Sequence, residues 1–123
     1  FKPSVAPIKV GIFRLINNVE FDPIVEKIRK LLAYRNIVCK VDSSSGTVGR
    51  RYSRADELGI PFGVTVDFQS LLDDAVTVRE RDSTSQIRVP LVKLIDLIED
   101  LVTNGKGNKS QYLVCFINVF HVF

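Results

Sequence analysis

The chain has 123 residues, of which 46% are hydrophobic and 25% charged, and its formal net charge is +3. This length fits one domain with one core, and the composition is ordinary for a soluble globular protein. A charge this small suits a partner that carries phosphates but does not require one. One histidine and two cysteines exclude a zinc-type ligand set. The longest apolar run, Tyr112–Phe123, is about half as long as a membrane span.

The first two expected strands are separated by a helix. Ile8–Phe13 is apolar and β-branched, which predicts a strand. A helix should follow from Asp22 to Asn36, with Asp22 as its N-cap and Pro23 in its first turn. Ile37–Val41 predicts the second strand, in which Cys39 should be a buried small hydrophobe instead of a disulfide partner. Strand, helix and strand at this spacing form a βαβ unit, so the strands should pair in parallel.

A second helix and a hairpin are expected next. After a turn at Ser43–Gly46, apolar residues at helical spacing predict a helix that Gly59 and Pro61 end, with one face formed by Val48, Tyr52, Ala55 and Leu58. Phe62–Phe68 alternates between apolar and small or polar residues, which predicts a half-buried strand. Ala75–Glu80 alternates again, so the two segments should form a β-hairpin. The carboxylates of Asp73 and Asp74 fit the turn between them.

The last elements are a short strand and a helix. Ser83 and Gln86 imitate a helix capping box, but β-branched residues before Pro90 favour a loop and then a strand, Gln86–Val89. An apolar stripe predicts a helix from Leu91 to about Thr103. The order is β-α-β-α-β-β-β-α, which predicts an α/β fold with a mixed sheet of about five strands, flanked by three helices. Residues 1–104 form the expected domain, and residues 105–123 a polar linker and an apolar tail.

The densest group of unusual residues is Ser43–Gly59. Arg50, Arg51 and Arg54 lie within five positions, and Arg50 and Arg54 share a helix face because they are four residues apart. Two interpretations are open: a solvated face neutralised by nearby carboxylates, or a clamp for phosphates or bases, which suits the planar guanidinium group. The glycines in Gly46–Gly49 fit an anion cradle or simply the start of a helix.

A second polar cluster, Arg79–Ser83, leaves the hairpin. Arg79 and Arg81 should point to one side of the strand, because alternate residues share a face. The cluster is either charge pairing at a sheet edge or a reader of base edges. No catalytic triad is expected, since the only histidine, His121, lies in the apolar tail. A nucleotide-binding domain is a weaker hypothesis, because no Walker A motif is present.

Three segments together resemble a known family. VDSSSGTVGRRYSRADELGIPFGVTVDF (Val41–Phe68), VTVRERDSTSQIRV (Val76–Val89) and VAPIKV (Val5–Val10) are similar to the C-terminal anticodon-binding domain of eukaryotic and archaeal glycyl-tRNA synthetases. The resemblance implies a mixed sheet flanked by helices, in agreement with the predicted order. The chain departs from the family in the short connection Gln69–Asp74 and in the tail Lys109–Phe123.

The resemblance implies a role in recognising glycine tRNA, whose anticodon ends in two cytosines. It implies no catalytic site and no cofactor in this domain, and a parent class II synthetase that uses ATP and Mg in an N-terminal catalytic domain. A homodimeric parent, no membrane association and a cytoplasmic, or also mitochondrial, location are further implications. A start at Phe1 and the absence of methionine agree with a fragment. The alternative is the accessory subunit of mitochondrial DNA polymerase, which has a related domain.

The resemblance places Arg50 and Arg81 as the leading base readers. It places Asp67 and Phe68, at the end of the third strand, as acceptor and stacking partners for cytosine. Arginine can donate to the cytosine N3 and O2, a carboxylate can accept from N4, and an aromatic ring can stack on the base. This prediction requires that Arg50 and Arg81 converge on one open surface.

The remaining candidates have two possible roles. Arg51 and Arg54 either contact RNA phosphates or pair internally with Asp56 and Glu57. Arg79 accompanies Arg81 as an RNA-binding candidate. Tyr52 falls on the apolar helix face and is expected in the core instead of at the RNA.

Overall fold

The computed structural model describes residues 6–43 and 46–104. In chain order its elements are β1 Val10–Arg14, the 3-10 helix η1 Val19–Phe21, α1 Asp22–Tyr34, β2 Cys39–Asp42, α2 Val48–Glu57, β3 Phe62–Val66, α3 Ser70–Asp73, β4 Ala75–Glu80, β5 Gln86–Pro90 and α4 Leu91–Asn104. The predicted order is confirmed, with the short helices η1 and α3 added. The predicted tail, with Cys115 and His121, lies outside the described residues.

The five strands form one mixed sheet in the order β2-β1-β3-β4-β5. β1 pairs in parallel with both β2 and β3, whereas β3, β4 and β5 pair antiparallel. The predicted βαβ unit and hairpin are therefore confirmed. β2 and β5 are the edge strands, and β3 is central.

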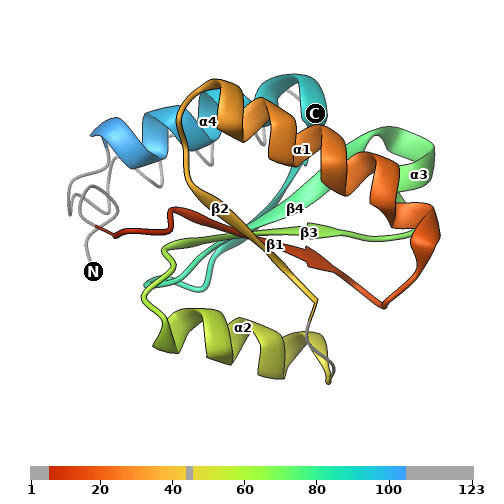
Figure 1. Cartoon of the computed structure of the whole chain (residues 1–123), viewed down its shortest axis with the longest axis horizontal. Coiled ribbons are helices and arrows are strands. Elements are labelled where there is room, and N and C mark those ends of the chain that lie inside the picture. Colours follow the sequence, from red (N-terminus) through yellow and green to blue (C-terminus); the bar gives the residue numbers. More distant parts are fainter. Residues whose placement is uncertain (1–5, 44–45, 105–123) are drawn as a thin grey trace.

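Two layers of helices enclose the sheet unequally. α1 and α4 cover one face, and α2 lies alone on the other (Figure 1). The main hydrophobic core lies on the α1 and α4 side, where residues of the sheet such as Ile12 and Val64 meet Ile28 and Leu94 of the helices. Because α2 is one short helix on a five-stranded sheet, polar side chains of the sheet are left beside it.

The central strand β3 is buried on both faces, whereas the alternating sequence predicted one buried face. All five residues of Phe62–Val66 are buried. On the α2 side, a Cβ built on Gly63 would lie 3.2 Å from the Phe13 ring and 3.5 Å from the Tyr52 ring. The Tyr52 hydroxyl also hydrogen-bonds to the Thr65 hydroxyl. Small and polar residues face α2 because the helix packs close to the strand there.

Helix caps explain where several elements begin. The predicted N-cap Asp22 is instead the first residue of α1, and Asn18 caps the preceding η1 by accepting from Glu20 N at 2.9 Å. Thr47 caps α2, its hydroxyl accepting from Arg50 N at 3.3 Å. The glycines around Thr47 are thus accounted for by the start of a helix, with Gly46 at φ +115°.

The connection between β3 and β4 is a short helix instead of a simple turn. β3 ends at Val66, two residues earlier than predicted, because Asp67 Oδ1 accepts from Ser70 N at 3.0 Å and so forms the turn that precedes α3. Asp73 closes the connection by accepting from Ala75 N at 3.0 Å, as the turn chemistry predicted. Among the described residues no helix is long and apolar enough to cross a membrane.

Candidate nucleic-acid interface

Helix α2 divides the less covered face of the sheet into two polar surfaces. We call the first the β4 flank; it contains Asp56, Asp67, Thr77, Arg79, Gln86 and Arg88. We call the second the β2 flank; it contains Lys40, Asp42, Arg50 and Arg54. Strand alternation produces both, because residues such as Val78 and Ile87 face the core while their neighbours face α2.

The centre of the β4 flank is Arg88, which ties three elements together. Its Nη1 donates to Asp67 Oδ2 at 2.8 Å and to Thr77 Oγ1 at 3.3 Å, and its Nη2 donates to Asp67 Oδ1 at 3.1 Å. Nη2 also lies 3.2 Å from Asp73 Oδ1. The Arg88 guanidinium on β5 therefore fixes the end of β3 and both ends of α3 relative to β5.

This ion-pair network sets the charge of its members. Burial acts to raise the pKa of Asp67, but hydrogen bonds from Arg88 and Ser70 outweigh it and hold the pKa below its ordinary value. Burial likewise acts to lower the pKa of Arg88, and the bonds to Asp67 and Asp73 raise it overall. Both groups stay charged at neutral pH. Asp67 Oδ2 has one guanidinium partner, which leaves room for a further donor.

Phe68 follows Asp67 in the sequence and provides a half-exposed apolar surface against Phe21. The Phe68 side chain is 47% exposed. The ring meets the buried Phe21 ring edge-on, with centroids 5.0 Å apart and planes at 61°. Phe21 therefore fixes the orientation of Phe68 while much of the ring faces solvent, which is what a stacking partner for a base requires.

Arg79 faces α2 from β4, Arg81 follows the end of β4, and both have internal partners. Arg79 forms a two-pronged pair with Asp56, at 3.2 and 3.3 Å, and its guanidinium lies 4.8 Å from the Tyr52 ring centroid. Arg81 Nε donates to Asp82 Oδ1 at 3.0 Å. Tyr52 is half-buried and lies under Arg79 and against Phe13, so it packs toward the sheet as its helix face predicted, but it is outside the main core.

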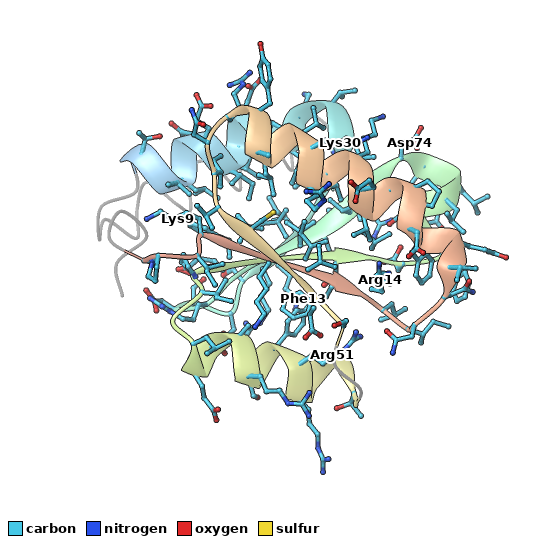
Figure 2. The ribbon with its side chains drawn as sticks, in the orientation of Figure 1. Lys9, Phe13, Arg14, Lys30, Arg51 and Asp74 are labelled. Atoms are coloured by element: carbon cyan, nitrogen blue, oxygen red, sulfur yellow. The ribbon has the colours of Figure 1, made fainter. Side chains whose placement is uncertain are left out.

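Arg51 is a scaffold residue and not a surface cation. Only 2% of it is exposed, and its Nη2 donates to the carbonyl oxygens of Arg14 and Leu15 at the end of β1. Its ionic partner is Asp42, with Nη1 3.8 Å from Oδ2, and not the predicted Asp56 or Glu57. Figure 2 shows Phe13 and Arg51 in the layer between the sheet and α2. Because Arg51 is buried, it is not accessible for the RNA phosphate contact that was one of its two predicted roles.

Arg50 and Arg54 lie on the β2 flank, away from Arg81. Arg54 lines a cavity with Lys40, and Arg50 shares its helix face. Arg51, next to Arg50, reaches β1 opposite Val66, whereas Arg81 N donates to Pro61 O, just before Phe62. The length of β3 between these ends is roughly 13 Å at about 3.3 Å per residue. The backbones of Arg50 and Arg81 therefore lie toward opposite ends of β3, and the convergence of their side chains on one surface stays a prediction.

Arg88 is the member of this surface that the sequence analysis missed. Its signal was present in Gln86–Pro90, where Ile87 and Val89 alternate with it and face the core. The register then places Arg88 opposite Thr77, on the same face as Arg79.

Among the described residues, no group of three or more histidine, cysteine or acidic side chains is placed to hold a metal ion. Cys39 is a free, half-buried thiol whose pKa is raised by burial.

The chain matches the family model described as "Anticodon binding domain" over residues 4–101. It is 46% identical over 105 residues to glycine–tRNA ligase 1, mitochondrial, of Saccharomyces cerevisiae, a match that covers 85% of this chain and 15% of the relative. It is 47% identical over 104 residues to glycine–tRNA ligase of Caenorhabditis elegans, covering 83% and 14%. A putative glycine–tRNA ligase of Schizosaccharomyces pombe is 44% identical over 116 residues, covering 94% and 18%. The chain thus spans less than a fifth of the length of these relatives.

A solved structure of prolyl-tRNA synthetase from Cryptosporidium parvum, complexed with L-proline and AMP, shares the fold. The TM-score is 0.78 at 20% identity, and the match covers 98% of this chain and 25% of that one. At this identity the similarity shows the fold alone. These comparisons give no support to the alternative of a polymerase accessory subunit. The chain belongs to the family of anticodon-binding domains, and its resemblance to those of glycyl-tRNA synthetases is confirmed.

Proposed function

We propose that this domain reads the anticodon of glycine tRNA with the β4 flank and Phe68. The observation that carries the proposal is the half-exposed Phe68 ring, which follows directly in sequence on Asp67 of the Asp67–Arg88 pair. Anticodon bases are unpaired, so they can stack on an aromatic ring and present their Watson–Crick edges to polar groups. The free position on Asp67 Oδ2 suits the N4 amino group of cytosine.

The separation of Arg50 from Arg81 changes how the RNA is held. The backbones of the two residues lie toward opposite ends of β3, which favours contacts with different parts of the RNA. Arg81 instead belongs to the base-reading side, and Arg50 contacts the phosphate backbone of a neighbouring part of the anticodon loop. Phosphate contacts position the RNA, while the Phe68 region supplies the discrimination between bases.

The test compares Phe68→Ala with a matched variant on the same helix region. We expect Phe68→Ala to weaken binding of glycine tRNA at least about tenfold, because base stacking contributes about 1–3 kcal/mol. Leu72→Ala is the control, since Leu72 lies on α3 nearby and is 82% exposed. Changing the anticodon cytosines to uracil should weaken binding to the unmodified chain and have little further effect on Phe68→Ala. Equal affinity for both RNAs would remove the base-reading role.

The domain acts, in this proposal, as part of a longer glycine–tRNA ligase. The parent is a homodimer whose catalytic domain uses ATP and Mg, and it works in the cytoplasm and also in mitochondria. The chain covers only a small part of the length of each relative, which supports a longer parent protein. Antibodies against the chain should detect a protein far larger than 13.8 kDa in both the cytoplasmic and the mitochondrial fractions of the cell. A species of that mass alone would contradict the proposal.

A further inference from the structure

A polar hollow opens at the end of the sheet that carries Phe68. It has a volume of about 280 Å³ and is lined by Arg14, Asn17, Asn18, Val19, Asp22 and Ser43. Arg14 ends β1 and Ser43 follows β2, so the hollow lies outside the carboxyl ends of these parallel strands. The ends of β1 and β3, the start of α1 and the helix α3 share this end of the molecule (Figure 1). Ligands of open α/β sheets commonly bind at this position.

The helix η1 connects this hollow to the Phe68 ring. Val19, at the start of η1, lines the hollow, and Phe21, at its end, has its ring centroid 5.0 Å from that of Phe68. β2, β1 and β3 are successive neighbours in the sheet, so the ends of β2 and β3 lie roughly 10 Å apart at about 4.8 Å per strand. Neighbouring unpaired nucleotides span such a distance when their bases are splayed out. A base in the hollow would therefore adjoin a base on Phe68.

The hollow presents neutral hydrogen-bonding groups to a ligand. Its charged lining residues, Arg14 and Asp22, pair with each other, with Nη2 2.9 Å from Oδ1, which disfavours a phosphate here. Asn17 and Ser43 are exposed, and an amide and a hydroxyl each donate and accept. The edges of bases carry donors and acceptors side by side and so complement this surface. The volume is just below the range of about 300–1,000 Å³ for drug-sized ligands, which suits a single base.

Asn18 gives the hollow a hydrogen-bonding group of fixed polarity. Its Oδ1 accepts from Glu20 N at 2.9 Å and so caps η1. Because the oxygen is held there, the amide presents its Nδ2 to a ligand as a donor. The ring N3 is an acceptor in cytosine but carries a hydrogen in uracil. A donor at this place therefore favours cytosine, since uracil would leave two donors facing each other without an acceptor.

We propose that this hollow binds the second of the two anticodon cytosines, and that Asn18 distinguishes cytosine from uracil there. The inference rests on the proposed function, in which the other cytosine stacks on Phe68. Asn18 Nδ2 donates to the ring N3, Asn17 Oδ1 accepts from the N4 amino group, and Val19 packs against the base. The base held on Phe68 brings its neighbour to the hollow.

The test uses Asn18→Asp, which removes the donor but keeps an oxygen that can cap η1. The full chain is titrated with glycine-tRNA anticodon stem-loops in which each cytosine is changed to uracil separately. In the parent chain each change should weaken binding by about tenfold. In Asn18→Asp one of the two changes should lose its effect and the other should keep it. Because the RNAs carry equal charge, comparing them cancels the effect of the added carboxylate.

Further variants separate this inference from the proposed function. Asn17→Ala, at an exposed position, should reduce discrimination at the same cytosine as Asn18→Asp, whereas Phe68→Ala should reduce it at both. Asn36→Asp makes the same change at an exposed position beyond the end of α1 and should leave discrimination intact. Full discrimination at both cytosines in the Asn17 and Asn18 variants would remove this inference and leave the proposed function standing. A parent chain that binds all the RNAs equally would remove both.

Discussion

The two flanks of α2 use the same residue types in opposite ways. On the β4 flank, Arg79 and Arg88 are each held by carboxylates at 2.8 to 3.3 Å, and the side chain of each is less than one third exposed. On the β2 flank, Arg50 and Lys40 are exposed. The comparison teaches that arginines close together in the sequence can have different roles, some in internal ion pairs and others exposed to solvent. Neutralised guanidinium groups order the polar side chains of the sheet, and exposed ones remain to attract phosphates.

Position around the helix axis decides which role each arginine has. Arg50 and Arg51 are adjacent in sequence, yet one is exposed and the other is 2% exposed. Successive residues of an α-helix point about 100° apart. Arg51 therefore points into the layer above β1 and Arg50 points outward. Substituting the two residues in the same way separates the roles.

The largest expected effect is on stability, from Arg51→Met. The substitution leaves the carbonyl groups of Arg14 and Leu15 and the carboxylate of Asp42 without this partner. We expect the free energy of unfolding to fall by about 3 kcal/mol. Urea denaturation of Arg51→Met and Arg50→Met measures this loss. The free energy of unfolding of Arg50→Met should stay within about 0.5 kcal/mol of that of the parent chain. Equal losses in both variants would contradict the assignment of Arg51 to the scaffold.

A smaller loss is expected on the β4 flank from Arg88→Met. Its pairs with Asp67 and Asp73 are partly exposed, so the free energy of unfolding should fall by about 1–2 kcal/mol. Lys40→Met, from the β2 flank, is the control and should change it by less than about 0.5 kcal/mol. Hydrogen exchange should also speed up in α3, since Arg88 contacts both ends of that helix. Unaltered exchange in α3 would contradict this positioning role.

The β2 flank should instead affect RNA binding. Arg50→Gln should reduce the dependence of log Kd on log salt concentration by about one, because one phosphate contact is lost. Lys30→Gln, on α1, should leave the slope unchanged. Titrations of glycine tRNA at several salt concentrations measure both. An unchanged slope in Arg50→Gln would place the RNA away from this flank.

The smallest expected effect is a pH dependence that comes from Asp67. Its folded-state pKa lies below the ordinary value of 3.8, so its ionised form stabilises the fold above that pH. The contribution is lost as the pH falls through the folded-state pKa. We therefore expect the unfolding free energy to decline less steeply on acidification in Asp67→Asn than in the parent chain. Urea midpoints measured from about pH 5 to about pH 2 test this, and parallel curves would contradict it.

The sequence by itself determined the order of the elements and the identity of the family. Apolar residues recur every 2 residues in the strands and every 3.6 residues in the helices, and both patterns are local. The caps and the Pro and Gly residues at the ends of elements are local signals too. The motifs of Val41–Phe68 and Val76–Val89 carried the resemblance for the same reason, because motifs are continuous in sequence. The packing of Tyr52 toward the sheet could be predicted from its helix face alone.

Only the tertiary structure decided which side chains meet. Arg51 pairs with Asp42 instead of Asp56, and Asp56 pairs with Arg79. The reason is that α2 connects β2 to β3 across β1, so β2 lies on one side of the helix and β4 on the other. Ion pairs between segments depend on strand order and register. Nearby sequence spacing does not encode these, since they follow from the packing of the whole chain.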